Sequence, residues 1–248
     1  MTPANDEVEL WLIPTDQPPQ LVDQLRELLD PAERERARAA EDPVRRDRFT
    51  AAHGVVRLLV AERLGLSAAG LRWRRGPNGK PEPVGAWSGP GGLRLNYSAS
   101  GALAVLALAA GRRVGVDIEE LPDPRVATRV ADRFFPARDA HWVAAAGSPG
   151  DRAARFATLW CRREACVKVY GGRLAESLGL TVGDAGPVRL PVAGVSCSVR
   201  DVPLPGHPGF RAAVAVQGTR PFRLRVAVWD GARADVLTDH HLSVTAGG

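Results

Sequence analysis

The pattern of apolar and polar positions along the chain predicts a mixture of strands and amphipathic helices. Alternating apolar positions, or short apolar runs bounded by turn residues, are typical of strands. By this criterion the expected strands are residues 8–13, 71–74, 93–97, 103–109, 114–119, 194–199, 210–217 and 222–229.

Apolar residues three and four positions apart predict the helices. The expected helices are residues 18–29, 43–64, 124–133, 136–146 and 151–170. Asp30-Pro31 is interpreted as the end of the first helix, and Gly171-Gly172 as the end of the last. The stretch 75–92 is rich in glycine and proline and is expected to be loop.

The order of these elements favours the α+β class, because helices and strands are mixed without strict alternation. A strand–helix–strand set precedes residue 112 and another follows it. The sequence therefore predicts two halves, residues 1–112 and 113–248. Apolar residues make up 45% of the chain and charged residues 25%, which is ordinary for a globular protein.

Composition also excludes several classes of protein. The longest apolar stretch, residues 102–110, is far shorter than the roughly 18 residues of a membrane span. The first ten residues are acidic and polar, unlike a signal peptide. The three cysteines are odd in number and lack metal-ligand spacing, which disfavours a disulfide framework or a zinc site. A reducing cytoplasm is the expected location.

The charge balance points to an acidic partner. The net charge is +5 and the pI is about 9.7, which favours nucleic acid, phosphorylated ligands or an acidic protein. Basic residues gather in the stretches 57–80 and 152–173, each of which also fits the solvated face of a helix. Only Lys80 and Lys168 are lysines among 33 basic residues. Lysine is a compact, flexible point charge and arginine a planar fork, so the two do different work.

A pair of acids lies on one predicted strand. In the segment Gly-Val-Asp-Ile-Glu, side chains alternate, so Asp117 and Glu119 share one face while Val116 and Ile118 share the other. Two carboxylates about 7 Å apart along a strand suit a hard cation that takes oxygen ligands, above all Mg²⁺. The same pattern also fits a solvated strand face.

A third acid lies on the predicted helix 151–170. Trp160, Glu164 and Lys168 share one face at 3.6 residues per turn, beside Phe156 and Val167. One interpretation is an ion pair on a surface helix. An acid among apolar residues is, however, costly to bury without a partner. A metal ion or a partner charge would remove that cost.

These segments together resemble the ordered motifs of the Sfp-type 4′-phosphopantetheinyl transferases. The motifs are Asn-Tyr-Ser-Ala-Ser at 96–100, Gly-Val-Asp-Ile-Glu at 115–119 and the helix segment 160–168. Gly79-Lys80-Pro81 resembles the family's Gly-Lys-Pro turn, and Phe134-Phe135 before a helix is also similar. The resemblance runs from about residue 30 to residue 175, and the order and spacing of the motifs make it specific.

The resemblance implies two α+β halves related by a pseudo-two-fold axis, with the active site in the cleft between them. It implies coenzyme A as donor and a carrier-protein serine as acceptor. By motif position, Asp117, Glu119 and Glu164 would bind Mg²⁺, with Mn²⁺ possible. The expected carrier is an acidic acyl or peptidyl carrier protein, which suits the basic chain. Two halves within one chain suit a monomer.

The same resemblance implies roles for single residues. Gly79, Lys80 and Pro81 would lie near the adenine, and Ser98 near the phosphates. Lys168 would contact the pyrophosphate and stabilise the departing phosphate. Glu164 would help to deprotonate the serine. With Asp117, these two residues form the predicted catalytic set.

Two positions depart from the family pattern. Ala99 stands where the family usually has a histidine that helps to hold the 3′-phosphate of coenzyme A. The family often has a basic residue near Gly54 for the same phosphate. The candidates to compensate are Arg34, Arg36, Arg38, Arg48 and Arg57. Alternatively, donors without the 3′-phosphate are accepted, or the scaffold serves a different reaction. Arg163 replaces a common lysine and keeps the charge.

Two other functional readings remain open. A repurposed family member would keep the metal and nucleotide site but act on a small molecule or another acceptor. A nucleic-acid-binding module or metal nuclease would use the basic stretches, but the chain shows no zinc-finger, RNP-like or helix-turn-helix signature. Gly76–Pro81 lacks the spacing of a P-loop. The five histidines, His53 among them, have no spacing that suggests a catalytic dyad or metal site.

Overall fold

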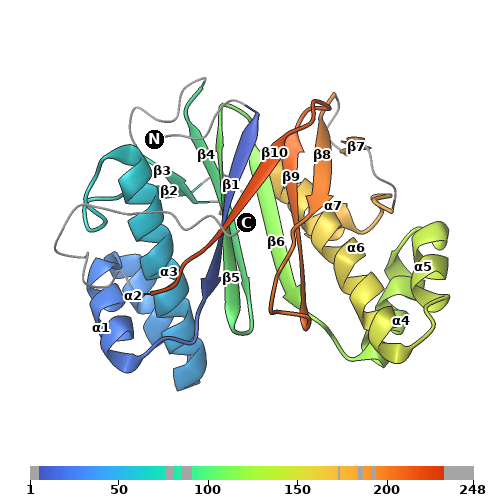
Figure 1. The fold of residues 1–248 in the computed structure, drawn as a ribbon, viewed down its shortest axis with the longest axis horizontal. Coiled ribbons are helices and arrows are strands. Elements are labelled where there is room, and N and C mark those ends of the chain that lie inside the picture. The colour runs from blue at the N-terminus through green and yellow to red at the C-terminus, as the bar shows by residue number, and fades with distance from the viewer. Residues whose placement is uncertain are drawn as a thin grey trace.

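The computed structural model describes residues 6–75, 81–84, 91–172, 174–183, 187–190 and 194–231. Two β-sheets face each other in the centre, and helices cover the outer face of each sheet (Figure 1). The predicted α+β class is confirmed. No helix in the described ranges is long and apolar enough to cross a membrane.

The first sheet has the order β10-β1-β5-β4. Its strands are β10 (Arg223–Val228), β1 (Glu7–Pro14), β5 (Leu103–Ala110) and β4 (Leu93–Ser100). Strand β1 runs parallel to β10 and antiparallel to β5, and β4 is antiparallel to β5. Every residue of β5 is buried, because a core lies on both faces of this sheet. Its outer face carries α1 (Pro19–Leu28), α2 (Pro31–Arg38) and α3 (Pro43–Leu64).

The second sheet has the order β6-β9-β8-β7. Its strands are β6 (Val114–Glu120), β9 (Phe210–Gln217), β8 (Ser196–Asp201) and β7 (Pro187–Arg189). The helices of this side are α4 (Pro124–Phe134), α5 (Ala137–Ala144), α6 (Pro149–Tyr170) and α7 (Leu174–Ser177). Helices α3 and α6 are both 22 residues long and lie on the outer faces of the two sheets. Strand β10 comes from beyond residue 112 yet joins the first sheet, so the proposed boundary there stays a prediction.

The two sheets meet through their edge strands, β4 and β6. The backbone N–H of Val116 donates to Asn96 Oδ1 at 2.8 Å, and both residues are buried. Apolar side chains of β1, β5, β6 and β9 fill the space between the sheets. An amide side chain thus ties the first motif to the second.

Gly115 lets helix α6 lie directly against strand β6. A Cβ atom at this position would lie 2.1 Å from the carbonyl oxygen of Ala165 and 2.7 Å from the backbone nitrogen of Val169. Only glycine fits such a close approach of two backbones. The glycine therefore sets how far Glu164 and Lys168 stand from the acids of β6.

Three sequence predictions of local structure were wrong. Asp30-Pro31 was interpreted as the end of the first helix, and α1 does end just before it, but helix α2, of which Asp30 is the N-cap, was missed. Its carboxylate accepts from the N–H of Glu33, and Glu33 reaches back to the N–H of Asp30, which is a capping box with proline in the first turn.

The second error is β3 (Pro81–Pro83), which lies inside the stretch 75–92 predicted to be loop. It pairs antiparallel with β2 (Trp73–Arg75). Proline is tolerated in such a two-stranded ribbon because it has open edges. The third error is the omission of the short elements α7 and β7.

Candidate active site

Asp117, Lys168 and Ser98 meet where β4, β6 and α6 converge. Lys168 Nζ donates to Asp117 Oδ1 at 2.6 Å and to Ser98 Oγ at 3.0 Å. Ser98 Oγ in turn donates to the same Asp117 oxygen at 2.8 Å. The Asp117 side chain is buried, whereas Lys168 is partly exposed. The structure thus brings together one predicted residue from each of the three motifs.

The other two predicted metal ligands are held by serine hydroxyls. Ser100 Oγ donates to Glu119 Oε2 at 3.0 Å, and Ser177 Oγ donates to Glu164 Oε1 at 3.1 Å. Burial raises the pKa of Glu119, the charge of Asp117 adds to this rise, and the Ser100 hydrogen bond opposes it. Burial also raises the pKa of Glu164; Lys168 opposes the rise and Asp117 adds to it. The charge of Asp117 therefore disfavours ionisation of both glutamates.

One oxygen of Asp117 is available to a divalent cation. Asp117 Oδ2 is buried and has no hydrogen-bond partner within the described part of the chain. Three crowded carboxylates beside one lysine leave an excess of negative charge, and hard cations such as Mg²⁺ take oxygen ligands of this kind. No three His, Cys, Asp or Glu side chains in the described ranges are already gathered around one point. The ligand set Asp117, Glu119 and Glu164 therefore stays a prediction.

Because side chains alternate along β4, this strand contributes residues to both sides of the site. Asn96, Ser98 and Ser100 point towards β6, where their partners lie. Tyr97 and Ala99 point to the other side of the strand and line a cavity of about 590 Å³. Ser100 borders this cavity and also donates to Glu119, so the cavity begins next to a residue that holds one of the predicted acids.

Arginines give this cavity a positive wall. Arg36, Arg45 and Arg48 line it. Arg48 is held by Asp16, with Nε 2.6 Å from Oδ1 and Nη2 3.0 Å from Oδ2. Arg36 lies over the ring of Phe49, with its guanidinium carbon 5.1 Å from the ring centroid. A cavity of this charge suits an anionic ligand.

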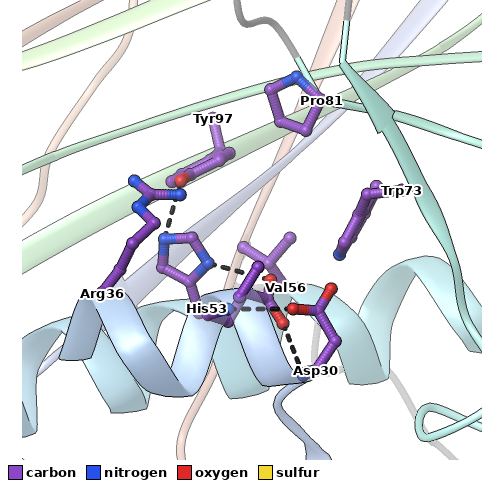
Figure 2. A pocket seen from close by; sticks show the side chains of 9 residues that line it. Asp30, Arg36, His53, Val56, Trp73, Pro81 and Tyr97 are labelled. Carbon is purple, nitrogen blue, oxygen red and sulfur yellow. Dashed lines mark hydrogen bonds and ion pairs between the residues drawn. The ribbon is translucent and has the colours of Figure 1, made fainter. Parts of the chain in front are cut away.

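A smaller pocket of about 160 Å³ adjoins the cavity, and Arg36, His53 and Tyr97 line both (Figure 2). His53 Nδ1 lies 3.1 Å from Glu33 Oε1, and Tyr97 Oη lies 2.7 Å from His53 Nε2. Sequence reasoning named Pro81 and Arg36 but did not connect Glu33, His53 and Tyr97, because these three come from α2, α3 and β4 with no shared spacing. The capping box of Glu33 was the available signal for α2, but no signal linked Glu33 to His53.

Comparison with known proteins places the chain in a family. The family model of the 4′-phosphopantetheinyl transferase superfamily matches residues 113–193, which include β6 and α6. HetI of Nostoc sp., a 4′-phosphopantetheinyl transferase, is 31% identical over 221 residues, which cover 88% of this chain and 91% of HetI. The chain belongs to the 4′-phosphopantetheinyl transferase family. The protein slr0495 of Synechocystis sp., provisionally named as such a transferase, is 28% identical over 71% of this chain and 70% of its own length.

Several predicted contacts of this transferase can now be placed. Pro81 lines the smaller pocket, and Ala99 lines the larger cavity. Gly79 and Lys80 lie outside the described residues. Gly54 faces α1: a Cβ there would lie 2.7 Å from Leu25 Cβ. A basic side chain would not fit at position 54, and the neighbouring His53 is the residue that reaches the pockets.

The structure also shows which of the arginines proposed to compensate for Ala99 line the cavity beside it and which do not. Arg57 is fully buried and donates to Glu33 Oε2 and to the carbonyls of Ala68 and Leu71. Arg34 donates through Nε to the Leu29 carbonyl. Arg36 and Arg48 line the cavity beside Ala99. These two arginines therefore remain the candidates for binding an anionic ligand of the transferase.

Arg163, next to the predicted ligand Glu164, has a structural role in the transferase. It is buried, pairs with Asp139 and lies over Phe135, with its guanidinium carbon 3.8 Å from the ring centroid. It also donates to the Leu180 carbonyl at 3.0 Å. The positive charge at this position therefore holds α5 to α6.

Proposed function

We propose that the protein transfers the 4′-phosphopantetheine group from coenzyme A to a serine of an acyl or peptidyl carrier protein, with Mg²⁺ as the required cation. Transfer of phosphopantetheine to carrier proteins is the activity of its family. One observation carries the finer proposal: Asp117 binds Lys168 through one oxygen, while its other oxygen is buried without a partner among the described residues. This arrangement leaves one oxygen of Asp117 available to a cation next to the ammonium group of Lys168. Transfer from a diphosphate requires a cation and a lysine placed in this way.

The reaction is a displacement at phosphorus. The serine oxygen of the carrier forms a bond to the phosphorus attached to pantetheine, the phosphoanhydride bond breaks, and adenosine 3′,5′-bisphosphate leaves with the bridging oxygen. Mg²⁺ would neutralise charge on the phosphate oxygens when it is bound. Asp117, Glu119 and Glu164 would hold it, and Mn²⁺ has the same preference for oxygen ligands.

Two residues of α6 have proposed roles, one in proton transfer and one in stabilising the leaving group. Glu164 takes the proton of the attacking serine, directly or through a water, and burial helps because it raises the pKa of this carboxyl. Lys168 stands by Asp117 and Ser98, where its ammonium group stabilises the departing phosphate.

The donor and the acceptor both suit the charge of the protein. The arginine-lined cavity beside Ala99 would take the phosphates at the nucleotide end of coenzyme A. Helix α4 and the start of α6 present a further basic surface that suits an acidic carrier protein. Its residues are Arg125, Arg129, Arg133 and Arg152. We propose that the protein acts as a monomer in the cytoplasm.

The second candidate function is a family member turned to another acceptor or small molecule. Ala99 favours it, because the β4 wall of the cavity lacks a charged side chain at this position. The meeting of Asp117, Ser98 and Lys168 favours the transfer to a carrier.

Mass spectrometry of candidate carriers, incubated with coenzyme A and Mg²⁺, tests the proposal. A carrier that gains the mass of one phosphopantetheine group supports it, and loss of the gain on Glu164→Gln or Lys168→Ala supports the two roles. Glu27→Gln changes an exposed acid on α1 and serves as the matched control. If no carrier is modified while a small molecule is, the second function replaces the first. A variant of Glu164 or Lys168 that reacts at the wild-type rate removes its assigned role.

A further inference from the structure

Strands β4 and β6 carry a matched pair of serines and acids where the two sheets meet. Ser98 and Ser100 are two positions apart on β4 and share one face of it, because side chains alternate along a strand. Asp117 and Glu119 are related in the same way on β6. Ser98 Oγ donates to Asp117 Oδ1 at 2.8 Å, and Ser100 Oγ donates to Glu119 Oε2 at 3.0 Å. Each acid of β6 is thus held through one oxygen by its own serine.

The direction of the Ser100 hydrogen bond is fixed by a third group. The backbone N–H of Glu120 donates to Ser100 Oγ at 3.1 Å. A hydroxyl carries a single hydrogen, and an ionised carboxylate, which is the form that binds a cation, can only accept. The hydrogen of Ser100 is therefore committed to Glu119 Oε2, and β6 itself holds the serine in place.

Asp117 presents only one oxygen to a cation. Its Oδ1 accepts from Lys168 Nζ at 2.6 Å as well as from Ser98, and these two bonds take both lone pairs of that oxygen. The ammonium group also repels a cation from this side. Oδ2 is buried and has no hydrogen-bond partner in the part of the chain that the structure describes. Asp117 is therefore a one-oxygen ligand.

The two glutamates follow the same rule. Glu119 is held through Oε2 by Ser100, and Glu164 is held through Oε1 by Ser177 at 3.1 Å. A cation that binds both oxygens of such a carboxylate competes with the serine hydroxyl for the engaged oxygen. A cation that binds the other oxygen keeps the hydrogen bond. The serines thus favour coordination through one oxygen of each acid.

Cations differ in how well they accept such ligands. Ca²⁺ takes about six to eight oxygens and often binds both oxygens of a carboxylate, whereas Mg²⁺ is smaller, requires a nearly octahedral arrangement and keeps places for water or phosphate oxygens. Selectivity between the two follows from the number and flexibility of the ligands. Carboxylates that each offer one oxygen, leaving the remaining places to water and phosphate, suit Mg²⁺.

We propose that Ser100 determines the cation specificity of this site: its hydroxyl keeps Glu119 a one-oxygen ligand, so that the protein binds Mg²⁺ in preference to Ca²⁺. This inference rests on the proposed function, since it takes Asp117, Glu119 and Glu164 as the cation ligands. Ser100 acts through Glu119 and is a positioning residue. It is also the serine to test, because Asp117 keeps the donor of Lys168 when Ser98 is removed.

Displacement of bound Mn²⁺ by Mg²⁺ or Ca²⁺, followed by electron paramagnetic resonance in the absence of coenzyme A, tests the inference. Mg²⁺ is expected to displace Mn²⁺ from the wild-type protein at a lower concentration than Ca²⁺. In Ser100→Ala both oxygens of Glu119 can coordinate, so the preference for Mg²⁺ over Ca²⁺ should fall by about tenfold, the value of one hydrogen bond to a charged group. Ser100→Thr keeps the hydroxyl and should keep the wild-type preference.

Ser198→Ala is the matched control. Ser198 Oγ donates to the Gly218 carbonyl at 3.2 Å, so the loss of this hydroxyl should leave the cation preference unchanged. Equal displacement of Mn²⁺ by the two cations in the wild-type protein, a wild-type preference in Ser100→Ala, or absence of Mn²⁺ binding overturns the inference.

These measurements need no carrier protein, so the two proposals fail separately. Mg²⁺-dependent transfer to a carrier, together with an unchanged preference in Ser100→Ala, leaves the proposed function standing and removes this inference alone. A reduced preference in Ser100→Ala, with no carrier modified by the wild-type protein, supports the inference and removes the proposed function.

Discussion

The ammonium group of Lys168 lies 2.6 Å from one oxygen of Asp117, while the other oxygen of the same carboxylate is buried without a partner among the described residues. One carboxylate thus joins helix α6 to strand β6 and still offers a lone pair to a cation. A cation bound to this carboxylate would therefore stabilise the contact between α6 and β6.

Mg²⁺ is expected to raise the melting temperature of the protein through this carboxylate. A ligand that binds only the folded state at 100 times its Kd stabilises by about 2.7 kcal/mol, which corresponds to roughly 5 °C or more for a chain of this size. Asp117→Asn should abolish most of the shift, whereas Glu27→Gln should keep it. Thermal unfolding with Mg²⁺ and with a chelator measures both. A shift of equal size in the Asp117 variant would place the cation elsewhere.

Gly115→Ala is expected to destabilise the protein by about 3 kcal/mol or more, because the added methyl group would overlap the Ala165 carbonyl and push α6 away from β6. Gly147→Ala is the matched control: no atom lies within 4 Å of its Cβ position, so the change should be within about 0.5 kcal/mol. Denaturant unfolding gives both values. Similar stabilities for the two variants would show that the helix adjusts freely.

Ala99→His is expected to increase discrimination between coenzyme A and dephospho-coenzyme A. A histidine here would add a donor to the arginine-lined cavity, and a hydrogen bond to a charged group contributes about 1.5–3 kcal/mol, or roughly ten- to a hundredfold. The ratio of kcat/KM for the two donors measures the effect in both proteins. Equal ratios would indicate that Arg36 and Arg48 already supply full recognition of the 3′-phosphate.

Acidification is expected to weaken the fold through His53. Burial lowers the pKa of His53 in the folded protein below the ordinary value of about 6.5, so the unfolded chain binds the proton first. The free energy of unfolding should therefore be insensitive to this group above pH 6.5 and fall as the pH drops from there towards the folded pKa. The charged and titratable groups around the ring are Glu33, Asp30, Arg36, Arg57 and Tyr97.

Denaturant titrations at pH 7 and 5.5 on the wild-type protein and on His53→Gln isolate that contribution. The variant should lose less stability between the two pH values than the wild type. Glu33 acts at lower pH, because its pKa lies below 4.5, and so does not obscure the comparison. An identical pH response of the two proteins would exclude His53 as its source.

The sequence by itself determined the local part of the candidate active site. Strand alternation puts Asp117 and Glu119 on one face, and helical spacing puts Glu164 and Lys168 on another, because both periods are properties of the backbone alone. The order of the motifs and the α+β class followed from the same local patterns. Helix α2, which follows Asp30, could also have been predicted from the sequence, because its capping box is a recognisable sequence signal.

Only the tertiary structure decided which side chains meet. Ser98 joins Asp117 and Lys168 across three elements, and Glu33, His53 and Tyr97 form one hydrogen-bond chain although 64 positions separate the first from the last. No periodicity carries such pairs, because their distance depends on how two sheets and their helices pack. Hydrogen bonds act over about 3 Å, and this distance is defined only when the layers close on one another.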